Sequence, residues 1–519
     1  MSNPAPTAAS SAGNASETGR STALILLWIC GFVSAAICAA FAWRYPLRGH
    51  TAELVDIGKL ANYRVWPFVG FVAGMLGLFS CYLGGILASR RVDPTQARWA
   101  LLVCGALQVA AMGWMYPVNA IDLFIYAVRS RLLTEYGADP LAAIPRDYRH
   151  DPYMQFASQE WADNVSPYGP LWNLIASPIT LIGGDQLALA LAGFKVLAAG
   201  CALLGAWLIV QTVAGDRPDD AAAAGIAFLW NPLVLWEGVG NGHNDLVMIV
   251  PVLAALLAWS RRRDAWVIPL LVVAATIKYV PLIVIPFAAL AILRRAPTWR
   301  DRLRVALLSV GGSALALAVA MFPFYDPEAI WDSVTQQGDI FLTSPAAMAI
   351  GVLQEYFAAA DVRWWATRVG YGILAATLVW QAVQVLRRPA WLPRAVFEAL
   401  FVFLLVATWN FRGWYLIWPL AVAAVLPSPW LAARAIAWTA GAMSVYALFI
   451  WIWHWWEVDF LTIQNIAVPI IAGPAILITV LHISVALWRQ VSATPQHHAI
   501  GSEATPPLRP IGEGVNAGK

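Results

Sequence analysis

Apolar stretches long enough to cross a lipid bilayer recur along this whole chain. A membrane-spanning helix needs about 20 mostly apolar residues, or somewhat fewer where protein surrounds it. Hydrophobic residues make up 60% of the 519 residues and charged residues only 12%, against about 25% charged residues in soluble domains. The sequence therefore predicts an all-α polytopic membrane protein with about 11–14 transmembrane helices. The fourteen apolar windows lie near 22–43, 66–88, 98–116, 185–213, 221–237, 243–260, 264–278, 279–294, 303–324, 366–387, 395–409, 412–427, 432–453 and 464–488.

Two apolar segments do not fit a simple crossing. The stretch 264–294 is too long for one span and short for two, so we expect two short helices that turn at 276–281. The segment 170–183 contains two prolines and is too short to cross, which predicts a re-entrant or interfacial helix. At the ends of the chain, the polar residues 1–21 and 490–519 are expected to be disordered cytoplasmic tails, the first of them without the pattern of a signal peptide.

Basic residues set the orientation, because cytoplasmic loops carry an excess of Lys and Arg. With the N terminus inside, the clusters at 90–91, 261–263, 294–304 and 387–394 fall in the cytoplasm. The loops 117–184 and 325–365 then lie on the extracytoplasmic face. Residues 44–65 carry four basic residues and also lie outside, against the rule.

Four polar segments interrupt the apolar pattern, at 119–126, 166–172, 231–245 and 409–415. An unsatisfied polar group in hydrocarbon costs several kcal/mol, so such segments persist where they face a watery cavity or a substrate. The predicted topology brings all four to the extracytoplasmic face. The pattern favours a membrane enzyme with a site at that face.

The first segment supplies a candidate catalytic base. Asp122, Tyr126 and Arg129 are spaced to share one face of a helix, and Tyr126 and Arg129 are candidate substrate-binding residues. A carboxylate at the hydrocarbon boundary suits general base catalysis, since partial desolvation raises its basicity. The alternative is that Asp122 caps the helix or pairs with Arg129.

The other segments supply candidate substrate-binding residues. Aromatic rings such as Tyr168, beside Asn and Asp residues, are typical of sugar sites, although turn chemistry and interfacial aromatics are the alternative. The polar run at 241–245, which ends the third segment, is expected to bind hydroxyls or a phosphate. Two cations at span ends, Lys278 and Arg412, are expected to bind phosphate. For those cations the alternative is snorkelling to lipid phosphates. These candidates are His243, Asn244, Asp245, Lys278, Arg412 and the neighbouring Trp409.

Other site types find no support in the sequence. The five cysteines lie in apolar segments without metal-ligand spacing, so neither a disulfide framework nor a zinc site is predicted. We expect no metal, no cofactor and no nucleic-acid partner. The chain also lacks the Gly-rich nucleotide loop and the DxD motif of soluble sugar-nucleotide enzymes.

At these polar segments the chain resembles the GT-C superfamily of membrane glycosyltransferases, which use polyprenyl-phosphate sugars. It is most similar to bacterial family-87 and α-(1→6)-mannosyltransferase-type enzymes. The resemblance covers roughly residues 100–425 and implies a catalytic carboxylate at Asp122. It divides the chain into additional N-terminal helices (22–97), a GT-C-like catalytic core (98–425) and C-terminal helices (426–489), with short helices in the extracytoplasmic loops.

The resemblance implies a multi-pass enzyme of the cell (inner) membrane that transfers a hexose, expected to be mannose, with inversion. The donor would be a polyprenyl-phosphate sugar and the acceptor a lipid or glycan, with Asp122 as general base. Because polyprenyl phosphate is a good leaving group, one base and phosphate-binding cations suffice. A secondary transporter, or a flippase for a lipid-linked glycan, is the alternative.

Overall fold

The computed structural model of the protein describes residues 9–492, apart from 51–53, 119–120, 325, 327, 329–330, 332–342 and 409. These described residues form helices, turns and one isolated antiparallel bridge between Pro46 and Met115. The predicted all-α class is confirmed.

The main helices follow one another through the chain. They are α1 (Ala9–Arg44), α4 (Val65–Ser89), α5 (Pro94–Gly113), α6 (Ile121–Tyr136), α8 (Pro170–Gly183), α9 (Leu187–Val213), α10 (Ala221–Leu229), α11 (Asp245–Ser260), α12 (Val267–Ile277), α13 (Ile285–Arg295), α14 (Trp299–Met321), α16 (Pro345–Leu353), α17 (Ala359–Arg387), α18 (Leu392–Val402), α19 (Ile417–Val425), α20 (Pro429–Val445) and α22 (Phe460–Ser492).

Short helical pieces connect or extend these helices. The α-helical ones are α2 (Leu47–His50), α3 (Ile57–Leu60), α7 (Gln159–Ala162) and α21 (Trp453–Trp456). The 3₁₀ pieces are η1 (Pro145–Tyr148), η2 (Met154–Phe156), η3 (Pro218–Asp220), η5 (Asp264–Trp266), η6 (Val280–Val284), η8 (Pro389–Trp391) and η10 (Gly413–Leu416). Three are π-helices: η4 (Val234–Gly240), η9 (Phe403–Ala407) and η11 (Tyr446–Ile452).

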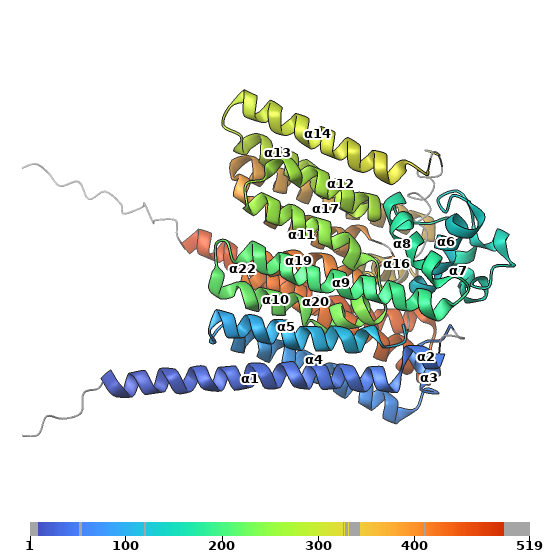
Figure 1. The fold of residues 1–519 in the computed structure, drawn as a ribbon, viewed down its shortest axis with the longest axis horizontal. Helices are drawn as coiled ribbons and strands as arrows, with labels where there is room; N and C mark the ends of the chain where they lie inside the picture. Colours follow the sequence, from blue (N-terminus) through green and yellow to red (C-terminus); the bar gives the residue numbers. More distant parts are fainter. Residues whose placement is uncertain are drawn as a thin grey trace, which may run out of the picture.

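Long helices run side by side along the molecule (Figure 1). Within the described part of the chain, eight helices are long and apolar enough to cross a membrane, or nine if a bent pair counts as one span. That pair is Pro218–Leu229 with Val234–Gly240, bent by 61°. Shorter apolar helices accompany them, such as Asp245–Ser260 and Gly413–Val425. The protein is therefore built as a multi-pass membrane protein.

The apolar windows predicted from the sequence lie mainly on helical residues. Some of them form helices too short to cross alone, such as α12 and α13 with 11 residues each. The turn expected at 276–281 is present, because α12 ends at Ile277 and Lys278 has an extended backbone with φ −150° and ψ 130°. The segment 170–183 is a single 14-residue helix, α8.

Both predicted tails overlap helices. The helix α1 begins at Ala9, so residues 9–21 are helical and not a disordered tail. The helix α22 likewise continues to Ser492, into the second predicted tail. Residues 1–8 and 493–519 lie outside the described residues.

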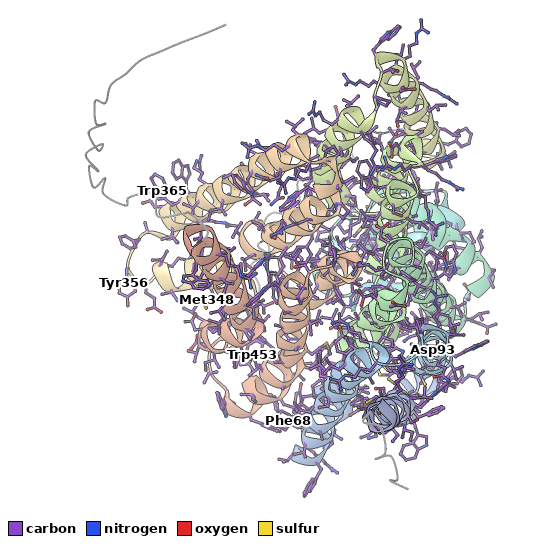
Figure 2. The ribbon with its side chains drawn as sticks, turned by 90° about the vertical axis from the view of Figure 1, so that its left-hand side faces the viewer. Phe68, Asp93, Met348, Tyr356, Trp365 and Trp453 are labelled. Atoms are coloured by element: carbon purple, nitrogen blue, oxygen red, sulfur yellow. The ribbon has the colours of Figure 1, made fainter. Side chains whose placement is uncertain are left out.

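The outer surface of the bundle is apolar. Only 11% of the most apolar window of α14 and 17% of that of α22 are buried within the protein. Figure 2 shows Trp365 of α17 at the outer edge of the bundle, with an exposed fraction of 62%. Side chains of this kind on long helices suit contact with lipid.

One end of the bundle carries the connecting segments that matter for function. The helices α2, α3, α6, α7, α8 and α16 all lie at this end, which we call the loop end (Figure 1). The sequence places the segments 44–65, 117–184 and 325–365 on one face of the membrane. Their described parts do lie together at the loop end.

Candidate functional site

The helix α6 presents Asp122 in its first turn, where the partial positive charge of a helix N-terminus favours a carboxylate. Asp122, Tyr126 and Arg129 are all buried, and Asp122 keeps an exposed fraction of 8%. Tyr126 packs edge-on against Tyr168, with ring centroids 5.2 Å apart, and against Trp172 at 4.9 Å. The predicted shared face of α6 therefore points into the protein, towards the segment at 166–172.

Arg129 anchors the loop that follows α6. Its Nη2 atom donates to the backbone carbonyls of Trp161, at 3.3 Å, and Asn164, at 3.0 Å. Burial lowers the pKa of Arg129 to about 10, so its guanidinium stays charged at neutral pH. The sequence suggests a ligand-binding role for Arg129, whereas these two bonds hold loop backbone.

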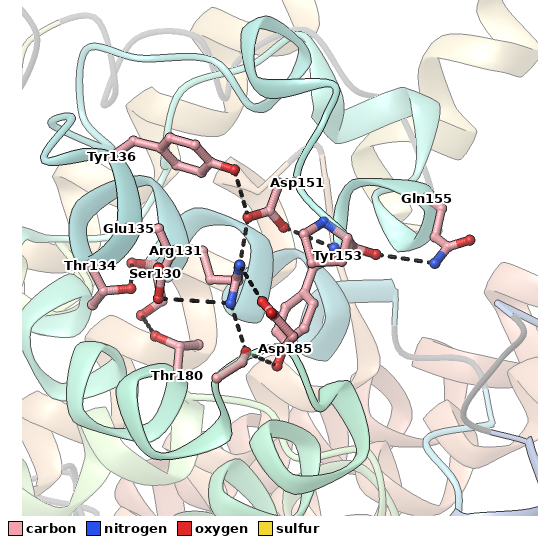
Figure 3. Close-up of polar contacts among 12 residues, drawn as sticks. Ser130, Arg131, Thr134, Glu135, Tyr136, Asp151, Tyr153, Gln155, Thr180 and Asp185 are labelled. Atoms are coloured by element: carbon pink, nitrogen blue, oxygen red, sulfur yellow. Dashed lines mark hydrogen bonds and ion pairs between the residues drawn. The ribbon is translucent and has the colours of Figure 1, made fainter.

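A second arginine on α6 ties the same loop to the following helices (Figure 3). Arg131 donates through Nε to Asp151 at 2.7 Å, through Nη2 to Asp185 at 3.0 Å, and through Nη1 to the Gly184 carbonyl at 2.6 Å. Its guanidinium also lies 4.6 Å from the ring centroid of Tyr153. The loop between α6 and α8 is thus fixed by polar bonds of a buried arginine that the sequence analysis does not predict.

The end of that loop meets α12 at a close backbone contact. The Gly169 amide donates to the Ile277 carbonyl at 3.0 Å. A Cβ atom at residue 169 would overlap the carbonyl of Thr276, so only glycine fits there. This contact brings Tyr168 of the loop beside Lys278, whose Nζ lies 5.8 Å from the Tyr168 ring.

Lys278 points into the protein and not outward to lipid. Its Nζ donates to Asp245 Oδ1 at 2.8 Å, and the side chains of Lys278 and Asp245 are 12% and 0% exposed. Trp418 Nε1 donates to the same carboxylate oxygen at 2.6 Å. The rings of Tyr415 and Trp418 lie 4.6 and 5.3 Å from the ammonium, so it is surrounded by aromatic faces.

The run at 241–245 turns sharply between η4 and α11. Gly242 has φ +73°, a left-handed conformation that glycine adopts without strain. The chain before the turn is held by Lys195 of α9, which donates to the Gly240 carbonyl. The turn directs His243, Asn244 and Asp245 into the interior, where each is at most 1% exposed.

His243 lies between two carboxylates. Its Nδ1 is 3.4 Å from Asp122 Oδ2, and its Nε2 is 3.4 Å from Glu237 Oε2. The imidazole stacks on Trp414, with centroids 3.8 Å apart and planes at 15°. Elements far apart in sequence, α6, η4 and η10, therefore meet at this ring.

Asn244 is a buried amide next to these charges. Within the described residues, neither its Nδ2 nor its Oδ1 has a hydrogen-bond partner. Buried polar atoms are nearly always bonded, so an orphaned amide indicates a place where a ligand or water binds. An amide offers both a donor and an acceptor, which suits a sugar hydroxyl.

The charges around Asp122 decide its ionisation. Burial alone raises the pKa of Asp122, but His243 at 3.4 Å, together with the charges of Arg412 and Lys278, holds that pKa below its ordinary value. The sequence argument predicts raised basicity from desolvation. The structure corrects this prediction, because cations from three other segments outweigh the burial.

Arg412 belongs to the same cluster. Its Nε donates to Asn410 Oδ1 at 3.0 Å, and its guanidinium carbon lies 5.8 Å from the Trp414 ring centroid. Trp409, the remaining candidate of this segment, lies outside the described residues. The four polar segments therefore converge, together with Lys278, on one site with three buried carboxylates, two cations, the His243 ring, an amide and several aromatic rings.

Sequence reasoning did not identify Glu237 or Tyr446 as site residues. Glu237 accepts hydrogen bonds from Asn241, at 2.8 Å, and from the Tyr446 hydroxyl, at 2.8 Å. A signal for Glu237 was present, because a carboxylate after Val-Leu-Trp in an apolar stretch is a functional candidate by default. Tyr446 carries no such signal, since tyrosine is common in spans and its partner lies more than 200 positions away.

The comparisons with known proteins point to one family. Residues 26–294, just over half of the chain, match the family described as "Alpha-(1->6)-mannopyranosyltransferase, N-terminal domain". The chain is 30% identical over 177 residues to alpha-(1->6)-mannopyranosyltransferase A of Corynebacterium glutamicum, a match that spans only 33% of this chain and 34% of that relative. It is 28% identical over 408 residues to alpha-(1->6)-mannopyranosyltransferase A of Mycobacterium tuberculosis, which covers 74% of each chain.

The family match begins at residue 26 and so includes α1 and α4. These two helices, which the sequence analysis treats as an addition before a catalytic core, are thus part of the region shared with the family. The match also contains Asp122, Glu237, His243 and Lys278. On this evidence the chain belongs to the alpha-(1->6)-mannopyranosyltransferase family of membrane hexosyltransferases.

Proposed function

We propose that this protein transfers a mannosyl group from a polyprenyl-phosphate donor to a hydroxyl of a lipid or glycan acceptor. One observation carries the proposal: an ionised, buried carboxylate at Asp122 shares a site with the cations Lys278 and Arg412. A base and cations are the groups that such a transfer needs. The family to which the chain belongs supports mannose as the sugar.

The chemistry follows from these charges. Asp122 takes the proton of the acceptor hydroxyl as its oxygen bonds to C1 of the sugar. The bond between C1 and the phosphate oxygen breaks, and the phosphate leaves with the electron pair. Lys278 and Arg412 stabilise the charge that grows on that phosphate. A single attack of this kind inverts the configuration at C1.

Aromatic rings and the amide would hold the sugar itself. Tyr168, Tyr415 and Trp418 line the neighbourhood of Lys278, and aromatic faces pack well against the C–H groups of sugars. The unpartnered amide of Asn244 supports a bond to a sugar hydroxyl. Trp409 remains a predicted contact.

The assay for this function uses purified protein in lipid vesicles with radiolabelled polyprenyl-phosphate mannose and a lipid or α-mannoside acceptor. We expect labelled product with a new α-(1→6) bond, and little product from GDP-mannose or from polyprenyl-phosphate glucose. Equal transfer from GDP-mannose would reject the lipid-linked donor. Movement of labelled lipid between leaflets without any product would instead support a flippase.

We further infer that the loop end faces the extracytoplasmic side of the cell (inner) membrane, because the predicted basic loops lie at the other ends of the spans. Single cysteines in place of Gln155 and Arg262, both exposed, test this inference. In intact cells, a membrane-impermeant maleimide should label Gln155→Cys and spare Arg262→Cys. The reverse labelling would place the site in the cytoplasm and exclude the proposed face.

A further inference from the structure

We propose that Glu237 and His243 are positioning residues that keep Asp122 ionised and aligned when the donor phosphate enters the site. This inference rests on the proposed role of Asp122 as the base. In it, His243 acts through Asp122 and Glu237 acts through His243. Neither residue needs to touch the sugar.

The placement of His243 supports a cationic ring. Each of its nitrogens faces a carboxylate oxygen at 3.4 Å, and its side chain is 1% exposed. Two carboxylates around one imidazole favour the form in which both nitrogens carry protons. Stacking on Trp414 fixes the plane of the ring and adds a favourable interaction with the cation. Within the described residues neither 3.4 Å contact meets hydrogen-bond geometry, so His243 interacts with the two carboxylates mainly through charge. Its place between them gives it a role other than the ligand binding predicted from the sequence.

Burial of the Glu237 carboxylate would destabilise the fold unless a cation such as the His243 ring pairs with it. Its side chain is 3% exposed within a π-helix, and a buried carboxylate must be paired and fully bonded to persist. Asn241 and the Tyr446 hydroxyl donate to it at 2.8 Å, but both are neutral. The charged partner that the structure gives Glu237 is His243. Single-turn π-helices often mark functional sites, which agrees with such a role.

Donor binding explains why Asp122 needs this second support. Without a donor, Asp122 faces His243, Arg412 and Lys278, with Arg129 and the hydroxyls of Tyr126, Tyr168 and Tyr415 nearby. An arriving phosphate attracts Lys278 and Arg412, and its own negative charge favours protonation of Asp122. His243 is held from behind by Glu237, so it continues to stabilise the carboxylate. Glu237 would thus orient His243 beside Asp122, as a third group orients the base and nucleophile in many enzymes.

Activity measured against pH separates this role from a structural one. In Glu237→Gln, His243 loses one carboxylate and gives up its proton at lower pH, so kcat should fall about 10- to 100-fold near pH 8. Most of that loss should be recovered as the pH is lowered towards about 6, where the imidazole regains its charge. In His243→Gln the loss should persist at every pH, because no imidazole remains. The KM for the donor should change less than kcat in both variants.

Tyr446→Phe is the matched control. It removes one hydrogen bond to Glu237 and leaves the carboxylate charge in place. Its pH profile should keep the wild-type shape. A loss in Glu237→Gln that does not depend on pH, equal to that of Tyr446→Phe, would mean that Glu237 only supports the fold and would overturn the proposal.

A readout without activity keeps the two proposals distinguishable. Nuclear magnetic resonance of ¹⁵N-histidine-labelled protein, with the His243 signal assigned by its loss in His243→Gln, reports the charge of the ring directly. His243 should stay protonated to higher pH in the wild type than in Glu237→Gln. Identical titration in both would reject the role of Glu237. Absence of mannosyl transfer by wild-type protein with the expected titration would reject the proposed function and leave the charge relation intact.

Discussion

Replacing Asp122 with Asn should lower mannosyl transfer by about 10²-fold or more, which is the usual contribution of a general base. Asn keeps the size of the side chain and its ability to contact His243, but it cannot take a proton from the acceptor. The burial and helical start of α6 remain, so the amount of folded protein should hardly change. The measurement is kcat in vesicles at saturating donor and acceptor.

Glu135→Gln supplies the matched control for this substitution. Glu135 lies on the same helix, and its side chain is 39% exposed and forms a 3.8 Å pair with Arg131. The same carboxylate-to-amide change there should leave transfer close to the wild-type rate. Near-normal transfer by Asp122→Asn, or an equal loss in both variants, would show that Asp122 is not the base.

Replacing Lys278 with Met should destabilise the protein by about 3–5 kcal/mol, because it leaves a buried carboxylate without its cation. That carboxylate is Asp245, which is fully buried and 2.8 Å from the lysine Nζ. The thermal unfolding temperature in detergent should fall accordingly, and transfer should be lost. Snorkelling to lipid headgroups, the alternative considered from the sequence, predicts little change in stability instead.

The double variant Lys278→Met with Asp245→Asn separates stability from catalysis. Asn at 245 is neutral and still accepts the hydrogen bond that Trp418 donates, so most of the lost stability should return. Transfer should stay low, since the cation proposed for the donor phosphate is still missing. If the double variant regains wild-type transfer, Lys278 serves only to balance Asp245.

The sequence alone could predict those residues of the candidate site that are polar within an apolar stretch. Asp122, His243 and Lys278 interrupt apolar stretches, and in hydrocarbon such residues persist only with a partner or a function. The turn at 276–281 could be predicted as well, from the length of the apolar stretch that contains it. Membership of a mannosyltransferase family, suggested by the same segments, is confirmed.

The pairings could not be predicted, because they depend on contacts between distant segments. Lys278 follows the end of α12 and pairs with Asp245 at the start of α11. His243 lies beside both Asp122 on α6 and Glu237 on η4. Nothing in the local sequence states which cation faces which carboxylate. The pKa of Asp122 is lowered and not raised for the same reason, since the lowering comes from charges that only the tertiary structure brings near.

The backbone bond between Gly169 and Ile277 links two parts of the site mechanically. Tyr168 directly precedes Gly169 in the chain, and Lys278 directly follows Ile277. A ligand that displaces the loop at Tyr168 would therefore carry the ammonium of Lys278 with it. Because no side chain fits at residue 169, any substitution there would force the loop and the end of α12 apart and break this link. An attempt to change acceptor preference by grafting this loop from a relative would shift the cation too, unless the end of α12 is exchanged together with it.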